Sequence, residues 1–242
     1  MKLYVLPVER VCPASCPWCI TDFREPIVKE EYLSVGKLKN ALAGTEYEKI
    51  EITGGGEPTL HPRICEIIGF CSDAARTQMY TCGANLRKVS NLSRLSSLCV
   101  SVAHYDEIRN HQIMGVNPDF DFLKSLNSRI KFSLLLHKSG ISKEEEVLRY
   151  IEWAKDYADS VVIRQLFEHD YKNKLIDEFV SSESLFLGWS IGEYKTTPQG
   201  NPVFSVDDLE VEVEYRSCAC EMNNPVLHAD GRLYRGWSGE KL

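Results

Sequence analysis

Short apolar runs and longer amphipathic stretches alternate along the chain as far as about Tyr171. The runs are rich in Val, Ile, Leu and aromatic residues, which fit a buried, pleated surface, so they predict strands. The stretches between them carry apolar residues three and four positions apart and predict helices. The six predicted strands are 3–8, 49–53, 78–81, 98–103, 130–136 and 160–166.

Two of the predicted helices have clear signals. Ser142 and Glu145 have the spacing of a capping box, and apolar residues at helical spacing follow them, so a helix is predicted over 142–158. A second helix is predicted to begin near Pro62, because proline suits the first helical turn. Its buried face is expected to contain Ile64, Ile67, Ile68 and Cys71.

Six strand–helix units in series indicate an α/β fold with a parallel sheet. Right-handed crossovers would curl that sheet into an open (β/α)6 partial TIM barrel. Ligands of such folds gather outside the carboxyl ends of the strands. We therefore expect one rim to carry the chemistry, from segments 12–19, 54–57, 81–85, 104–105 and 164–168 together with His137.

Three cysteines form a C-x3-C-x2-C run after the first predicted strand: Cys12, Cys16 and Cys19. Three thiolates from one loop can hold three irons of a 4Fe-4S cluster and leave the fourth iron open to a small molecule. A structural zinc site would need a fourth ligand, and the nearest histidine is His61. Three unrelated core cysteines are the alternative, which the polar, proline-containing turn disfavours.

Two motifs in order, Cys16-Pro-Trp-Cys19 and the Gly-Gly-Glu-Pro segment within 52–60, resemble those of the radical S-adenosylmethionine (SAM) enzymes. The resemblance implies an open barrel, an oxygen-sensitive 4Fe-4S cluster on the three cysteines, and SAM as the second cofactor. It also implies reductive cleavage of SAM to a 5′-deoxyadenosyl radical, with electrons from an external one-electron reductant such as flavodoxin or ferredoxin.

The same resemblance implies a set of SAM contacts. Glycines allow close approach of the backbone, and Glu57 is expected to accept a hydrogen bond from the SAM ammonium. Trp18 is expected to pack near the cofactor, with a loop anchor as the alternative. The hydroxyl of Ser101 should face away from its apolar neighbours, toward the SAM ribose. The implied contacts are Trp18, Gly54, Gly55, Gly56, Glu57, Pro58, Ser101 and Arg164.

Arg164 is a charged residue within an apolar strand, so it must find a partner. The SAM carboxylate is one candidate. An internal salt bridge, with Glu57 or Glu168, is the other.

The catalytic residues are not identified by the sequence, and three candidates stand out. His104 and Tyr105 begin a dense polar segment after the fourth strand. Cys82 stands where the resembled family often has asparagine, and either donates a hydrogen atom or simply packs. His137 and His169 are further rim histidines, suited either to proton transfer or to a satisfied structural role.

The C-terminal part is predicted to be an extension. We expect a barrel core over 1–171 and a helix and β-hairpin extension over 172–242 that caps the barrel. Segment 209–215 alternates with a period of two and suits an edge or hairpin strand, and Asp230-Gly231 signals a hairpin turn.

This extension resembles a shortened twitch or SPASM module. Cys218 and Cys220 alone cannot complete a second cluster, so none is expected. Trp237 is expected to fold inward, and Arg232 or Arg235 to contact an anionic substrate.

Composition bears on the substrate class, the cellular compartment and the state of the cysteines. The chain has 242 residues, 28 basic and 35 acidic, with a net charge of −7, which argues against a broad nucleic-acid surface. No apolar run suits a signal peptide or a membrane span, so a cytoplasmic protein is expected. Nine cysteines without a secretory context favour thiols and metal ligands over disulfides.

The prediction is a radical SAM enzyme that abstracts hydrogen from a small molecule, nucleotide-like or sugar-like. Peptide or protein modification and activation of a glycyl-radical partner remain alternatives. An iron–sulfur redox module without turnover is the alternative outside enzymes.

Overall fold

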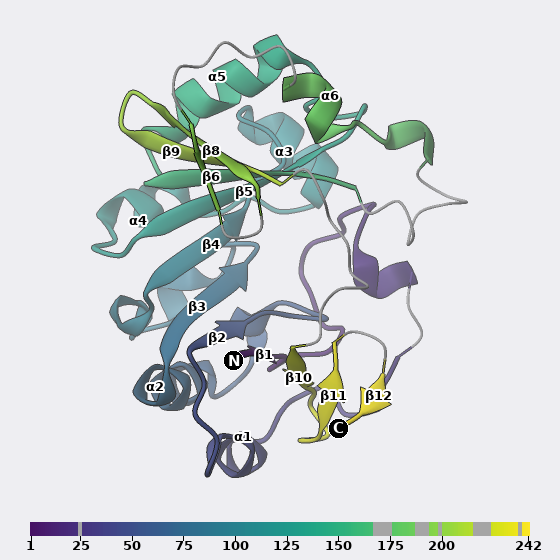
Figure 1. Ribbon diagram of the computed structural model, residues 1–242, viewed down its shortest axis with the longest axis vertical. Coiled ribbons are helices and arrows are strands. Elements are labelled where there is room, and N and C mark those ends of the chain that lie inside the picture. Colours follow the sequence, from purple (N-terminus) through teal and green to yellow (C-terminus); the bar gives the residue numbers. More distant parts are fainter. Residues whose placement is uncertain (24–25, 167–175, 187–193, 198–199, 215–223, 237–238) are drawn as a thin grey trace.

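The computed structural model describes residues 1–23, 26–166, 176–186, 194–197, 200–214, 224–236 and 239–242. Six parallel strands lie side by side in sequence order, which confirms the predicted α/β partial barrel (Figure 1). They are β1 (Lys2–Val5), β2 (Lys49–Ile52), β3 (Arg76–Thr81), β4 (Ser97–Ser101), β5 (Ile130–Leu136) and β6 (Ser160–Gln165).

Helices follow most of these strands, and α1, α2, α4 and α5 lie along the outer side of the curved sheet (Figure 1). The helices are α1 (Val35–Leu42), α2 (Ile64–Ala74), α3 (Glu107–Met114), α4 (Phe120–Ser125), α5 (Glu144–Ala154) and α6 (Ser182–Phe186). Short 3-10 turns are η1 (Ile20–Phe23), η2 (Pro58–Leu60), η3 (Leu86–Lys88), η4 (Leu92–Arg94) and η5 (Ile176–Glu178).

The helix signals are confirmed with one shift. Helix α2 buries the four predicted residues, Ile64, Ile67, Ile68 and Cys71. Helix α5 is capped one residue later than predicted, because the carboxylate of Glu146, not Glu145, accepts from the backbone N–H groups of Ser142 (3.0 Å) and Lys143 (3.1 Å).

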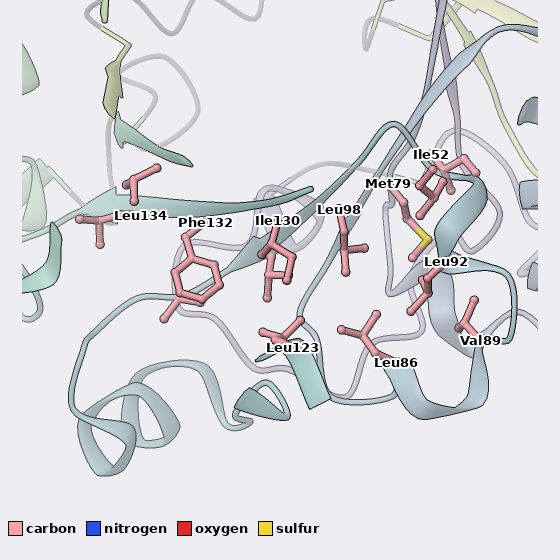
Figure 2. Close-up of a cluster of buried hydrophobic side chains, with 14 of the residues drawn as sticks. Ile52, Met79, Leu86, Val89, Leu92, Leu98, Leu123, Ile130, Phe132 and Leu134 are labelled. Carbon is pink, nitrogen blue, oxygen red and sulfur yellow. The ribbon is translucent and has the colours of Figure 1, made fainter. Parts of the chain in front are cut away.

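The main core lies between the sheet and the outer helices. Side chains of alternate strand residues point into it, and Figure 2 shows Ile52, Met79, Leu98, Phe132 and Leu134 among them. On β5 the intervening residues Lys131, Ser133 and Leu135 are only partly buried. The inner face of the barrel therefore has room for polar groups.

The described strands of the C-terminal part join both edges of this sheet. Strand β9 (Leu209–Val213) pairs in parallel with β6, and β8 (Pro202–Val206) and β7 (Lys195–Thr196) follow it antiparallel. At the other edge β10 (Pro225–Leu227) pairs in parallel with β1, followed by β11 (Leu233–Arg235) and β12 (Glu240–Lys241). The expected boundary at residue 171 lies outside the described residues.

Two of the described hairpins, β8–β9 and β10–β11, have turn residues suited to positive φ. The predicted turn at Asp230-Gly231 joins β10 to β11, with Gly231 at φ +80°. Strand β9 is a hairpin strand as predicted, and it lies inside the sheet. Its turn to β8 uses Asp207 and Asp208, at φ +46° and +71°. In the described part of the chain, no helix is both long and apolar enough to cross a membrane.

Candidate cluster and cofactor site

The three cysteines lie in the loop that leaves the carboxyl end of β1. This loop belongs to the segment that crosses the open side of the curved sheet before α1 begins (Figure 1). The backbone N–H of Ser15 donates to the carbonyl oxygen of Met114 (2.8 Å), and that of Cys19 donates to the carbonyl oxygen of Cys16 (3.0 Å). Cys12 is exposed, and Cys16 and Cys19 are half-buried free thiols.

The three thiols are close enough to influence one another. Burial, and after it the neighbouring Cys19 and Cys12, raise the pKa of Cys16 to about 12. Burial also raises the pKa of Cys12, with Glu57 and Cys19 contributing. Iron would relieve this repulsion, since a coordinating thiol is deprotonated by the metal charge. The donor set therefore fits an iron–sulfur cluster.

Among the described residues, no group of three His, Cys, Asp or Glu side chains is arranged around a single metal ion. This is compatible with a cluster, because each cysteine of a 4Fe-4S cluster binds its own iron and the sulfur atoms need not converge on one point. Cys12, Cys16 and Cys19 as cluster ligands stay a prediction.

The glycines after β2 let two rim loops pack together. A Cβ on Gly55 would lie 1.9 Å from the carbonyl oxygen of Glu9, and one on Gly56 would lie 2.3 Å from that of Val11. The N–H of Gly56 donates to the carbonyl oxygen of Val8 (3.0 Å). On Gly54 a Cβ would lie 1.7 Å from the oxygen of Gly56. Only glycine fits at these three positions, and Gly55 and Gly56 admit the backbone of residues 9–11, which leads into the cysteine loop.

Glu57 is an internal hydrogen-bond acceptor with 2% exposure. Its carboxylate accepts from the backbone N–H (3.0 Å) and hydroxyl (2.6 Å) of Thr59. It also accepts from the hydroxyl of Thr81 (2.6 Å) and the backbone N–H of Cys82 (2.7 Å). Glu57 thus ties the loop after β2 to the loop after β3. Three of these bonds go to Oε1 and one goes to Oε2, so one acceptor site of Oε2 is left. The contact with the SAM ammonium stays a prediction. Pro58 follows as the buried first residue of η2.

Trp18 anchors the cysteine loop to the rim. Its ring lies 4.2 Å from the ring of His137, measured between centroids. Together with Ala14 and Cys16, Trp18 packs against a small buried cluster of Cys82, Ala103 and Met114. The loop-anchor interpretation of Trp18 is therefore supported, and its contact with a cofactor stays a prediction.

Cys82 has the environment of a packing residue. It is 6% exposed, and burial together with the charge of Glu57 holds the pKa of its thiol well above the usual value. A thiol of this kind is a poor nucleophile. Its role as a hydrogen-atom donor stays a prediction.

His137 is buried beside Trp18 and uncharged near neutral pH. Burial lowers the pKa of His137 to about 4, and the charge of Glu178 only partly opposes this. Gly140 makes room for the ring, because a Cβ there would lie 2.1 Å from Nε2. That Nε2 has no hydrogen-bond partner among the described residues. His169, the other expected rim histidine, lies outside the described residues.

His104 and Tyr105 lie together after β4, with ring centroids 4.4 Å apart. The backbone N–H of Asp106 donates to Nδ1 of His104 (2.9 Å), so the ring proton is on Nε2. Burial lowers the pKa of His104. Their catalytic roles stay a prediction.

The side chain of Asn110 holds the segment that follows β4 in place, and the sequence does not reveal this role. Its side chain is fully buried, and its oxygen accepts from the backbone N–H of Ala103 (2.8 Å) and of His104 (3.3 Å). Its amide group donates to the side-chain oxygen of Asn117 (2.9 Å).

Arg164 forms an internal salt bridge with Glu214, and none with Glu57; Glu168, the other expected partner, lies outside the described residues. Its guanidinium donates from Nε (2.9 Å) and an Nη (3.0 Å) to the two carboxylate oxygens of Glu214. Burial opposes the charged form, but Glu214, Tyr80 and Cys99 together outweigh it, and they hold the pKa of Arg164 well above the usual value. The SAM carboxylate contact stays a prediction.

The register of β9 explains this pairing. Glu212 lies opposite Val162, so alternate glutamates of β9 face the inner side of the barrel. Glu210 lies 3.7 Å from Arg129 and Glu212 lies 2.9 Å from Lys131, measured between nitrogen and oxygen. The period-two pattern of 209–215 predicts that these acidic residues share one face of the strand. It does not predict which basic residues they contact.

Ser101 lies on the same inner face. It is in register with Ser133 of β5 and is partly exposed, while Val100 and Val102 are buried. Its predicted direction is confirmed. Its contact with the SAM ribose stays a prediction.

Known proteins with related sequences support the interpretation of the chain as a radical SAM enzyme. No protein-family model matches the chain. A GTP 3′,8-cyclase of Haemophilus influenzae is 26% identical over 265 residues, covering 98% of this chain and 77% of the relative.

Solved structures share the fold. SuiB of Streptococcus suis bound to S-adenosylmethionine has a TM-score of 0.68 and 16% identity, over 96% of this chain and 59% of the SuiB chain. The protein anSMEcpe with bound AdoMet and a Cp18Cys peptide has a TM-score of 0.58 and 12% identity, over 97% of this chain and 73% of its own.

The partial barrel with its cysteine loop and glycine segment defines an enzyme scaffold that gathers its ligands at the carboxyl rim. Together with these relatives, it places the chain in the radical SAM superfamily of enzymes, whose members use a 4Fe-4S cluster and SAM.

Proposed function

We propose that this chain is a radical SAM enzyme that acts on a nucleotide, with GTP as the first candidate substrate. The observation that carries the proposal is the likeness to relatives named GTP 3′,8-cyclase over 98% of the chain. The cysteine loop at the barrel rim supplies the chemistry that such a reaction requires.

The residues of the chain have distinct tasks in this proposal. Cys12, Cys16 and Cys19 would hold the cluster, and bound SAM would supply a radical able to remove hydrogen from an unactivated carbon. The glycine segment and Glu57 hold the cysteine loop against its neighbours. Trp18 closes one side of the loop against His137. The protein thus positions the reactants and excludes water.

A charged groove beside the C-terminal hairpin suits a phosphate-bearing ligand. Its lining includes Lys29, Lys37, Arg232 and Lys241, with Glu30 and Asp230 as the acidic members. Four cationic side chains against two acidic ones contrast with the net charge of −7 for the whole chain. Of the two arginines expected to contact an anionic substrate, Arg232 lines this groove and Arg235 does not. Each lies near an acidic residue, Arg232 4.0 Å from Asp230 and Arg235 3.8 Å from Glu240, measured between nitrogen and oxygen.

The proposal also covers the cellular compartment, the kind of substrate and the reductant. The enzyme would act in the cytoplasm on a small molecule, with flavodoxin or ferredoxin as the external reductant. The acidic net charge supports a small-molecule substrate over a nucleic acid.

A turnover assay tests the proposal. The protein is reconstituted anaerobically with iron and sulfide, reduced, and mixed with SAM and GTP. We expect GTP-dependent release of 5′-deoxyadenosine, with a changed nucleotide detected by mass spectrometry. Release that is independent of GTP and of other nucleoside triphosphates would reject the nucleotide substrate.

A peptide substrate is the second candidate, because the structural neighbour anSMEcpe was solved with a bound peptide. The same assay separates the two. Stimulation by cysteine-containing peptides and not by nucleotides would favour the peptide.

A further inference from the structure

His228 is a buried histidine at the carboxyl end of β10, and it is 3% exposed. Val226, two residues earlier, packs with Tyr4 and Leu6 in a cluster separate from the main core. Side chains alternate along a strand, so His228 shares the side of Val226, whereas Leu227 belongs to the main core. His228 therefore lies on the inner face of the barrel, at the rim that carries the cysteine loop.

Glu9 fixes the orientation of this imidazole. The Glu9 carboxylate oxygen Oε1 lies 3.0 Å from Nδ1 of His228 and accepts from the backbone N–H of Ala229 (2.9 Å). A carboxylate only accepts hydrogen bonds, so the proton of the ring is on Nδ1. When the ring carries only this proton, Nε2 is an acceptor with a fixed direction.

That acceptor has no hydrogen-bond partner in the described part of the chain. Nε2 of His228 is buried and makes no hydrogen bond among the described residues. A buried acceptor without a donor is costly, and native structures rarely retain one without a reason. His61 is the contrast: it is similarly buried, but Nε2 lies 2.8 Å from the carbonyl oxygen of Leu33 and Nδ1 accepts from the N–H of Arg63.

Tyr234 connects His228 to the charged groove. The two rings meet edge to face with centroids 4.9 Å apart, and the Tyr234 hydroxyl donates to Asp230 (2.8 Å). Tyr234 and Asp230 both line the groove that contains Arg232. A nucleotide has the matching layout, with phosphates that suit the cations and base N–H groups that suit a neutral acceptor.

We propose that His228 is a substrate-binding residue whose Nε2 accepts a hydrogen bond from an N–H group of the purine base, and that Glu9 is the positioning residue that sets its tautomer. The proposal rests on the nucleotide function proposed above. SAM also contains a purine, but the link through Tyr234 to the cationic groove favours the substrate nucleotide.

Calorimetric titration of the cluster-loaded protein with GTP and, separately, with SAM tests the assignment. His228→Leu removes the acceptor, and we expect it to weaken GTP binding roughly tenfold to a hundredfold while SAM affinity and iron content stay at wild-type levels. His228→Gln retains an acceptor oxygen and should recover much of the affinity. His61→Leu is the matched control, and should lower stability without changing the affinity for GTP.

Glu9→Ala tests the positioning role, with Glu9→Gln as its control. Glu9→Ala removes the oxygen that contacts both Nδ1 of His228 and the N–H of Ala229, whereas the amide oxygen of Glu9→Gln can take its place and keep both contacts. We expect the 15N chemical shifts of the His228 ring to move toward the Nε2–H form and GTP binding to weaken in Glu9→Ala, with little change in Glu9→Gln. An unchanged tautomer in Glu9→Ala would overturn the role of Glu9.

The outcomes separate the two proposals. Wild-type protein that binds SAM but neither GTP nor another purine nucleotide rejects the proposed function, and the role of His228 with it. Wild-type protein that binds GTP, with a His228→Leu variant that binds it equally well or loses only SAM affinity, overturns the inference alone. If His228→Leu fails to retain iron, the His228→Gln variant and the ring tautomer in Glu9→Ala decide.

Discussion

Arg164 and Glu214 are fifty positions apart in the chain, yet they form a two-pronged ion pair on the inner face of the barrel. The pair joins the last strand of the six-stranded barrel to the end of β9, and the guanidinium also lies 5.7 Å from the ring centroid of Tyr80. Both side chains are roughly three-quarters buried, with 29% and 24% exposure. The arginine that the sequence marks as needing a partner thus has one inside the protein.

Breaking this pair should destabilise the fold. We expect Arg164→Ala to lower the free energy of unfolding by about 1–3 kcal/mol, because the partly buried Glu214 is left without its donor. Arg164→Met combined with Glu214→Met should recover part of that loss in urea unfolding. SAM affinity in the double variant separates the two roles. A stable double variant that binds SAM at least tenfold more weakly would favour the SAM carboxylate as the ligand of Arg164.

The features of the fold that depend on local periodicity could be predicted from the sequence. The strands of the barrel and the buried face of α2 follow from apolar spacing, and the turn at Asp230-Gly231 follows from two residues. Long-range partners could not be predicted this way. Glu214 meets Arg164 only because β9 pairs with β6, and Glu57 meets Thr81 only because two rim loops touch. The contact between Glu9 and His228 spans 219 positions and depends on β10 pairing with β1.

The cluster ligands can be tested by counting iron. Replacing Cys12, Cys16 or Cys19 with Ala should remove most iron and sulfide and abolish SAM cleavage, because three thiolates already leave one iron without a protein ligand. Intact protein should contain about four irons per chain. Cys71→Ala is a suitable control, since Cys71 lies buried in α2, away from the loop, and should leave the iron count unchanged.

The same count addresses Cys218 and Cys220, which lie outside the described residues. A Cys218→Ala/Cys220→Ala variant should also retain about four irons, because two thiols cannot complete a second cluster. About eight irons in the intact protein, falling to four in this variant, would contradict that expectation.

The buried His137 should make stability depend on pH. Its pKa is lowered from 6.5 to about 4, so the unfolded chain binds the proton more readily, and stability should fall as pH is lowered from 7 toward 5. The nearby Glu178 raises this pKa and His104 lowers it, but burial dominates. Urea unfolding of wild type and His137→Phe at several pH values measures the effect.

We expect the stability of the His137→Phe variant to vary less with pH than that of wild type. Part of the slope should remain in the variant, because burial also lowers the pKa values of His61 and His104. Identical slopes in the two proteins would show that His137 is already protonated, or solvated, in the folded state.

Glu57→Gln should destabilise the rim even without SAM. One carboxylate oxygen accepts from Thr59 and Thr81 and the other accepts from the backbone N–H of Cys82. The glutamine amide nitrogen would replace one of these oxygens and place a donor against a donor in a site with 2% exposure. We expect the free energy of unfolding to fall by roughly 2–3 kcal/mol. Thr81→Val removes a single donor and should cost only about 1 kcal/mol. A Glu57→Gln variant with wild-type stability and tenfold weaker SAM binding would instead support the direct contact between Glu57 and the SAM ammonium.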